Sequence, residues 1–117
     1  MPGRYYIAGP MRGIALCNFP AFDAEASRLR TMGVWVVNPA DLDREAGFDP
    51  ARLPADTDWS SYTAMGFDLR AAAKRDIAAI MECDGVYLLP GWERSRGARA
   101  EKAVAEWLGL DVVFPRQ

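Results

Sequence analysis

Apolar residues gather in four short runs that are separated by longer amphipathic segments. The runs are rich in β-branched and aromatic residues, and they lie at residues 4–8 (RYYIA), 34–37 (VWVV), 85–89 (GVYLL) and 111–114 (DVVF). Short apolar runs of this composition, bounded by turn-forming residues, are typical of buried strands. The pattern therefore predicts four strands, and the first of them is expected near the centre of its sheet.

Between these runs, apolar residues recur at three- and four-residue spacing, which predicts three helices. We expect them at residues 18–33, from about residue 59 or 68 to residue 82, and at residues 95–109. Asn18 is a plausible cap of the first helix, with Pro20 in the first turn and Gly33 at the end. The second helix carries one apolar stripe that we expect to face the core, formed by Leu69, Ala73, Ile77, Ile80 and Met81.

Residues 38 to about 58 lack clear periodicity and contain three prolines and several aspartates. We expect a long loop there, in which a short helical turn is possible. Loops of this length in compact domains are often functional. A lid over a site, at residues 38–60, and a plain surface loop are both open interpretations.

The order β-α-β-loop-α-β-α-β predicts an α/β fold, a flavodoxin- or Rossmann-like three-layer sandwich with a mostly parallel sheet of four or five strands. Residues 1–117 have the length of one domain with a single core. In such sheets ligands bind outside the carboxyl ends of the strands. The stretches 9–13 (GPMRG) and 90–97 (PGWERSRG) follow the first and third strands. They are the candidate rim of a ligand site.

Charge and composition exclude several kinds of partner. A net charge of −2 argues against a nucleic-acid partner, because binding to its backbone needs clustered cations. A small anionic ligand needs only one or two donors and remains compatible. There is no run of about 18 apolar residues, and no leader with a basic start and an apolar middle. We therefore expect a cytoplasmic protein that does not bind a membrane.

The sequence contains no histidine, which limits the chemistry that it can perform. Ser-His-Asp and Cys-His catalysis are excluded, together with the commonest metal sites, so no metal and no cofactor is expected. The two cysteines lack a CxxC spacing and are expected to be reduced thiols. Carboxylates are the leading candidates for catalysis.

Two carboxylates lie on the apolar faces of predicted helices. On a helical wheel of residues 95–109, one arc is polar and the opposite half is apolar, formed by Ala98, Ala100, Val104, Ala105, Trp107 and Leu108. Glu101 lies in the middle of that apolar half, and Asp76 likewise lies beside the stripe of the preceding helix. Burying a bare carboxylate costs several kcal/mol, so each acid must be paired, protonated or exposed to a cavity. The plainer interpretation pairs each acid with an arginine, such as Arg28 or Arg70.

Paired acids suit chemistry at an acetal-like carbon, where one acid attacks or stabilises the cationic centre and the other manages protons. Tyr6, at the end of the first strand, is placed to reach the same crevice, although it is equally a candidate core residue. Ser95 opens a helix N-terminus that offers a hydroxyl and backbone N–H groups to an anion, or it serves only as a helix cap. Arg12 opposite it would complete a phosphate clamp.

With these residues in place, the chain resembles the nucleoside 2-deoxyribosyltransferase-like superfamily, and most closely its small DUF4406 branch. The resemblance is carried by residues 6–13 (YIAGPMRG), 18–42 and 75–114. It covers nearly the whole chain except residues 44–62, and LPGWERSRGARAE (89–101) is its most specific part.

Nucleotide N-glycosidases of this superfamily, which hydrolyse 5′-monophosphates, are similar at matching positions. The matching residues are Tyr6, Gly9, Arg12 and Gly13 in the first motif, Asp76 with Asp84 in the second, and Ser95, Gly97 and Glu101 in the third; Met11 lies within the first motif and is included among the binding residues. The resemblance implies that Glu101 is the nucleophile at the anomeric carbon, and that Asp76 orients the sugar or shuttles a proton. It also implies that Tyr6 positions the attacking group and that Ser95 and Arg12 hold the phosphate.

The expected function is hydrolysis of the N-glycosidic bond of a nucleoside or deoxynucleoside 5′-monophosphate through a covalent glycosyl-Glu101 intermediate. Transfer of the sugar to a second base is the alternative within the same chemistry, and a non-catalytic nucleotide sensor or a purely structural protein are the alternatives outside it. The turn with Trp92, Glu93 and Arg94 differs from the characterised hydrolases, which leaves base recognition open. The resemblance further implies a homodimer or larger homo-oligomer.

Overall fold

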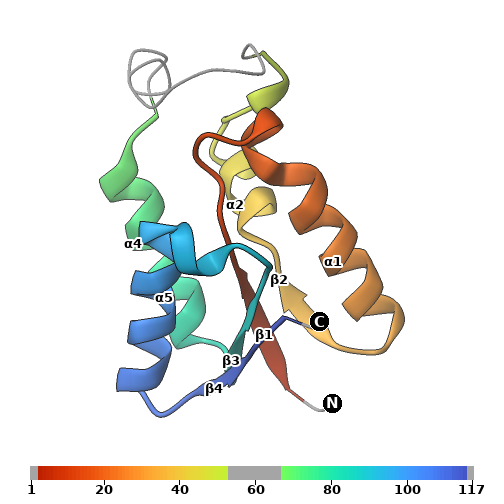
Figure 1. The fold of residues 1–117 in the computed structure, drawn as a ribbon, viewed down its shortest axis with the longest axis vertical. Helices are drawn as coiled ribbons and strands as arrows, with labels where there is room; N and C mark the ends of the chain where they lie inside the picture. Colours follow the sequence, from red (N-terminus) through yellow and green to blue (C-terminus); the bar gives the residue numbers. More distant parts are fainter. Residues whose placement is uncertain (1–2, 53–66, 116–117) are drawn as a thin grey trace.

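A four-stranded parallel sheet forms the centre of the protein (Figure 1), which a computed structural model describes at residues 3–52 and 67–115. The strands are β1 (Arg4–Ala8), β2 (Trp35–Val37), β3 (Gly85–Leu88) and β4 (Asp111–Val113). Their order in the sheet is β2-β1-β3-β4, and every neighbouring pair is parallel. The predicted α/β sandwich is therefore confirmed, with four strands among the described residues.

Helices cover both faces of this sheet (Figure 1). The described helices are α1 (Phe19–Thr31), α2 (Pro39–Glu45), α4 (Leu69–Met81) and α5 (Arg96–Trp107), joined by the 3₁₀ turns η1 (Ala15–Asn18), η2 (Pro50–Arg52) and η3 (Trp92–Arg94). Side chains alternate along β1, so Tyr5 and Ile7 pack in the core beneath α1, whereas Tyr6 and Ala8 pack in the core beneath α4 and α5. This alternation directs Tyr6 toward the two helices that carry the buried acids.

The strand order reverses at β1, because the chain continues from β1 to β2 on one side and later builds β3 and β4 on the other. Such a switch point leaves a crevice at the carboxyl ends of the strands, where ligands of open α/β sheets bind. The backbones after β1 and β3 approach each other closely there. A Cβ atom on Gly9 would lie 2.7 Å from the Cβ atom of Leu89, so only glycine fits at this position.

The predicted long loop is partly a helix, which corrects the sequence-based expectation. Asn38 precedes α2, and its side-chain oxygen accepts a hydrogen bond of 3.0 Å from the N–H of Ala40. Pro39 then occupies the first turn, a combination that favours helix initiation. Residues 53–66 lie outside the described residues. They include the last part of the predicted lid and residue 59, the earlier of the two predicted starts of the second helix.

The predicted cap of the first helix is also corrected in part. Asn18 does precede α1, but its side chain caps no N–H group of that helix. Its amide instead donates a 2.8 Å hydrogen bond to the carbonyl of Pro10 and so fixes the turn after β1. Residues 16, 17 and 18 all have positive φ angles between 55° and 59°. Ser95 and Asp68, in contrast, cap α5 and α4 through their side chains.

The expected orientation of the apolar stripe is wrong for α4 and is confirmed only in part for α5. The buried residues of α4 are Ala72 and Ile80. The stripe predicted for the core is largely exposed, with exposed fractions of 44% at Leu69, 39% at Ile77 and 63% at Met81. Of the predicted stripe, only Ile80 is buried. The other four residues of the stripe, Leu69, Ala73, Ile77 and Met81, therefore lie exposed on α4.

On α5 the buried residues are Ala98 and Ala105, and Trp107 is 83% exposed. At about 100° per residue, Trp107 lies on the opposite side of the helix from Ala105. The small alanines therefore make the contact with the sheet, although the bulk of the apolar residues lies elsewhere.

None of the helices in the described part of the chain is long and apolar enough to cross a membrane. Both cysteines, Cys17 and Cys83, are buried, and no disulfide bond joins them.

Candidate active site

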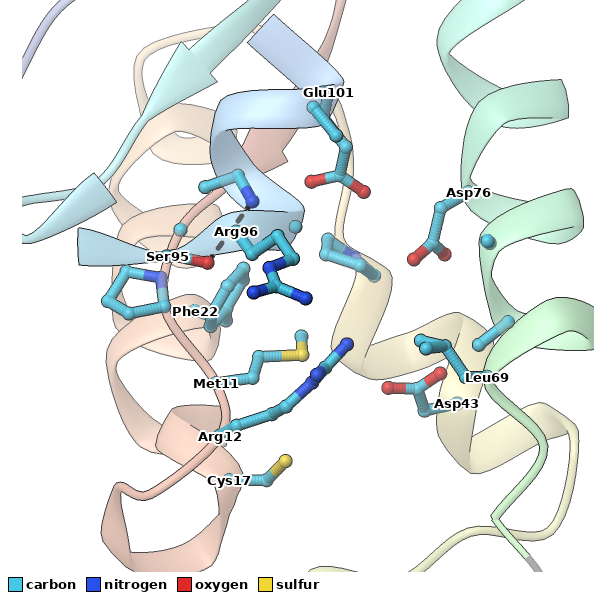
Figure 2. Close-up of a pocket in the computed structure, with 18 of the residues that line it drawn as sticks. Met11, Arg12, Cys17, Phe22, Asp43, Leu69, Asp76, Ser95, Arg96 and Glu101 are labelled. Carbon is cyan, nitrogen blue, oxygen red and sulfur yellow. Dashed lines mark hydrogen bonds between the residues drawn. The ribbon is translucent and has the colours of Figure 1, made fainter. Parts of the chain in front are cut away.

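A cavity of about 390 Å³ opens at the carboxyl ends of β1 and β3 (Figure 2). Its walls come from the turn after β1, the start of α5, the inner side of α4 and the first residues of α2. A volume of this size matches the sites that hold small molecules. The predicted ligand rim therefore surrounds a real cavity.

Glu101 and Asp76 lie at the centres of the buried faces of their helices. Ala98, Glu101 and Ala105 follow one another at spacings of three and four residues, so Glu101 lies between the two alanines that contact the sheet. On α4, Asp76 lies one turn from both Ala72 and Ile80, the buried residues of that helix. Packing of the helices against the sheet thus directs both carboxyl groups into the cavity, where they face one another in Figure 2.

Tyr6 connects the sheet to this acid pair. Its side chain is fully buried, and its hydroxyl donates a 2.7 Å hydrogen bond to Oε2 of Glu101. Burial and the charges of Glu101 and Asp76 raise the pKa of Tyr6 well above its ordinary value, so the hydroxyl keeps its proton and acts as a donor. The hydrogen bond fixes the position of one oxygen of Glu101.

Neither acid is neutralised by a cation among the described residues. Arg28, one of the partners considered, pairs with Glu25 instead. Oδ1 of Asp76 is buried and has no hydrogen-bond partner in the described part of the chain. The interpretation in which each acid serves a buried arginine is therefore not supported.

Burial raises the pKa of Glu101 to about 8, with further increases from the charges of Asp76 and Asp43 and a decrease from the Tyr6 hydroxyl. Burial likewise raises the pKa of Asp76 to about 7, and the charge of Asp43 adds to this effect. Because each added negative charge makes the next ionisation harder, these acids titrate as a coupled group. Such a group retains a proton near neutral pH.

The opposite wall of the cavity is cationic. Arg12, Arg94 and Arg96 line it, and Figure 2 shows the side chains of Arg12 and Arg96 extending into the cavity. Ser95 begins α5, and its hydroxyl accepts a 3.1 Å hydrogen bond from the N–H of Ala98. The backbone N–H groups of the first turn of α5 and two guanidinium groups therefore face the same space, an arrangement that suits an anion.

All the predicted site residues except Gly13 line the cavity, namely Tyr6, Gly9, Met11, Arg12, Asp76, Ser95, Gly97 and Glu101. Gly13 is exposed and provides the positive φ angle of 77° that the turn requires. Asp84 lies at the other end of the sheet, where its carboxylate accepts a 2.8 Å hydrogen bond from the N–H of Arg4. It takes no part in the site.

Sequence reasoning missed the residues that α2 and the aromatic wall contribute. Asp43 of α2 lines the cavity and is only 4% exposed. The remaining wall is apolar and includes Phe22, Phe48 and Phe67. The signal for α2 was present in the sequence, since an Asn-Pro pair commonly starts a helix and the buried positions 39, 40 and 43 follow helical spacing.

The described residues contain no cluster of three or more acidic or sulfur ligands arranged to hold a metal ion. The charged groups of the cavity are instead three carboxyl groups, of Asp43, Asp76 and Glu101, together with the guanidinium groups of three arginines. This arrangement can bind an anionic small molecule and place its neighbouring carbon beside two carboxyl groups.

Replacing Glu101 by glutamine is expected to stabilise the fold at neutral pH. The pKa of Glu101 is about 8 in the folded state against 4.5 ordinarily, so the folded state binds more protons than the unfolded state between these values. The unfolding free energy of the wild type therefore falls as pH rises through this window. Thermal melts at several pH values should show Glu101→Gln gaining on the order of 1–3 kcal/mol over the wild type between about pH 5 and 8.

Glu106→Gln is the matched control, because Glu106 is exposed on the same helix. Its stability relative to the wild type should change by less than about 0.5 kcal/mol over this range. Stability curves of Glu101→Gln and the wild type that run parallel would contradict the raised pKa.

No curated protein and no solved structure matches the chain. The model of one protein family, described as a domain of unknown function (DUF4406), matches residues 3–114. The match spans all the described strands and helices and both walls of the cavity, and the chain therefore belongs to the DUF4406 family.

Proposed function

We propose that the protein hydrolyses the N-glycosidic bond of a nucleoside or deoxynucleoside 5′-monophosphate, releasing the free base and a sugar 5-phosphate. The observation that carries this proposal is the pair of carboxyl groups of Asp76 and Glu101, which share one cavity without a cationic partner among the described residues. The resemblance of the site motifs to nucleotide N-glycosidases supports the same function.

Cleavage of a glycosidic bond needs two carboxyl groups in different protonation states. The coupled, raised pKa values of Asp76 and Glu101 supply this condition near neutral pH. The hydrogen bond from Tyr6 favours the ionised form of Glu101, since it is made to an acceptor oxygen. The pKa of Glu101 is the higher of the two, about 8 against about 7 for Asp76, so the form with Glu101 ionised and Asp76 protonated is the less populated state of the coupled pair. We assign Glu101 as the nucleophile and Asp76 as the proton donor from the resemblance and from the Tyr6 hydrogen bond, and the reaction proceeds from that less populated state.

In the first step, a carboxylate oxygen of Glu101 forms a bond to the anomeric carbon while the bond to the base breaks. The electron pair of that bond leaves with the base, which takes a proton from Asp76. In the second step, water attacks the anomeric carbon, Glu101 leaves as a carboxylate, and Asp76 takes the proton of the water. Both carboxyl groups are then restored.

The cationic wall explains the choice of a monophosphate over a nucleoside. Arg12 and Arg96 provide forked donors, and the N-terminus of α5 adds backbone N–H groups. Forked guanidinium donors match phosphate oxygens and bind them more strongly than neutral groups do. Phosphate bound at this wall would hold the sugar against the opposite wall, where the two acids lie.

The test is to incubate the protein with nucleotides and nucleosides and to detect free base by chromatography. We expect base release from at least one 5′-monophosphate and slower release from the matching nucleoside. Glu101→Gln should reduce the rate by at least about 1,000-fold, because it removes the nucleophile. Glu106→Gln is the control on the same helix and should leave the rate unchanged.

Further arms of this experiment separate the alternatives. Formation of a new nucleotide when a second free base is added would indicate sugar transfer in place of hydrolysis. If no base is released from any nucleotide, although nucleotides raise the melting temperature, the hydrolase proposal is wrong and the protein is a nucleotide-binding module.

We also propose that the protein acts as a homodimer through the exposed stripe of α4, formed by Leu69, Ala73, Ile77 and Met81. These residues recur every four positions and are all exposed. Leu69, Ala73 and Ile77 also line the cavity. A partner that packs on this stripe would therefore cover the edge of the cavity at α4.

Charge favours a second copy of the chain as this partner. Arg70 and Lys74 lie toward the start of α4, and Glu82 lies just after its end. Two copies of α4 that pack antiparallel about a twofold axis would place Leu69 against Met81 and Ala73 against Ile77, with both Arg70 and the N-cap residue Asp68 near Glu82 of the other copy. A twofold interface requires such self-complementarity.

Met81→Glu tests this interface, because it places a charge in the middle of an apolar contact. We expect the wild type to have twice the 12.9 kDa mass of the chain in sedimentation experiments, and Met81→Glu to be monomeric. The matched control is Met32→Glu, because Met32 at the end of α1 is 62% exposed, against 63% for Met81. A monomeric wild type, or an unchanged dimer in Met81→Glu, would contradict the proposal.

A further inference from the structure

Asp43 is a buried carboxylate that the proposed reaction does not use. It comes from α2 and is 4% exposed, and Figure 2 shows its carboxyl group directed into the cavity. Oδ1 lies 3.5 Å from the guanidinium of Arg75. Oδ2 accepts no hydrogen bond from the described residues, so it can receive a donor from a ligand.

The lining of the cavity has three parts, and Asp43 belongs to the part that faces neither the proposed phosphate nor the proposed anomeric carbon. Arg12, Arg94, Ser95 and Arg96 form the cationic wall. The acid pair with Tyr6 occupies the place proposed for the anomeric carbon. The lining that remains is almost entirely apolar, and Asp43 is its only charged group among the described residues. Its apolar residues include Met11, Cys17, Phe22, Pro39, Phe48, Phe67 and Leu69.

An apolar, aromatic lining suits a planar base. Phe48 and Phe67 lie with ring centroids 5.1 Å apart and both line the cavity. Aromatic side chains bind bases of every kind through their faces, which gives affinity without selecting one base. Selection then depends on the few polar groups present at that end of the cavity.

We propose that Asp43 selects substrates whose base carries an exocyclic amino group, that is, cytosine, adenine or guanine nucleotides over uracil, thymine or hypoxanthine nucleotides. This inference rests on the proposed function for the placement of the sugar. Burial raises the pKa of Asp43 above its ordinary value, whereas the nearby guanidinium of Arg75 lowers it and so favours the charged form. In that form the carboxylate can only accept hydrogen bonds. Amino groups donate at the edge of these bases, whereas keto oxygens of uracil, thymine and hypoxanthine would face the carboxylate as a second acceptor.

Buried hydrogen-bonding groups discriminate strongly, because the wrong substrate leaves them without a partner. We therefore expect the kcat/KM for dCMP to exceed that for dUMP by at least about 100-fold, or dAMP to exceed dIMP by the same factor. Within each pair an amino group is replaced by a keto group, and the adjacent ring nitrogen changes from an acceptor to an N–H donor. Which of the two pairs is cleaved depends on the size of the base that the cavity accepts.

Asp43→Asn provides the direct test, since the amide has the same shape but also donates hydrogen bonds. We expect the variant to lose at least about 10-fold of the preference for the amino-bearing base, chiefly through a gain in rate with the keto-bearing base. Glu45→Gln is the matched control, because Glu45 is exposed on the same helix and its substitution removes the same charge. Its preference should equal that of the wild type.

A binding measurement separates this inference from the proposed function. Calorimetry with Glu101→Gln and with the double variant Glu101→Gln/Asp43→Asn measures recognition without turnover. We expect Glu101→Gln to bind dCMP more tightly than dUMP, or dAMP more tightly than dIMP, and the double variant to lose this preference. That result would support the role of Asp43 even if no base is ever released. The proposed role of Asp43 would be overturned by equal kcat/KM values or equal binding within each pair. It would also be overturned by an unchanged preference in Asp43→Asn, or if none of these nucleotides binds.

Discussion

The structure depends on one electrostatic constraint, the burial of two carboxyl groups that form no ion pair with a cation in the described part of the chain. Asp76 and Glu101 lie at the centres of the buried faces of α4 and α5, where aliphatic residues would give a more stable core. Burial of such groups costs several kcal/mol unless they are paired or protonated. Here the cost is reduced by the cavity between the helices, by the hydroxyl of Tyr6 and by retention of a proton. Such unfavourable placements are characteristic of functional sites.

The parallel sheet supplies the geometry that this constraint requires. The reversal of strand order at β1 leaves adjacent carboxyl ends of β1 and β3 uncovered, and both loops that follow carry glycine and arginine. The close approach at Gly9 holds these loops together. Tyr6 in the central strand then reaches Glu101 on α5, so the rigid sheet fixes the position of the acid. The cationic wall and the acid pair thus lie on opposite sides of one cavity.

The fold, the acid pair and the two motifs at the rim of the cavity were predictable from the sequence, because they depend on local patterns. Strand composition, capping residues such as Ser95 and the parallel topology place the motifs after β1 and β3 on one edge. The anomalous positions of Glu101 and Asp76 also follow from helical spacing. In contrast, the wheel predicted the buried side of α5 only in part, since Ala98 and Ala105 contact the sheet while Trp107, from the same predicted apolar half, faces outward. The largest apolar residues of a helix do not always mark its buried face, because a helix that packs closely on a sheet contacts it through small residues.

Asp43 could not be assigned in the same way. Its role depends on α2, a short helix whose prolines and aspartates resemble a loop, and on the tertiary approach of α2 to α4 through the contact with Arg75. Contacts between segments far apart in the sequence leave no periodic signal. The exposed stripe of α4 is a related case, because an apolar periodicity indicates a buried face without showing whether the same chain or another copy covers it.

The central claim is that Asp76 and Glu101 share one cavity as a coupled acid pair. The most direct measurement is a titration of the side-chain carboxyl carbons by NMR, with Asp76→Asn as the second sample. The account predicts a pKa of Glu101 near 8 in the wild type and a clear decrease in Asp76→Asn, because one neighbouring negative charge is removed. A Glu101 carboxyl that titrates near its ordinary value of 4.5, or one that is unaffected by the substitution, would contradict it.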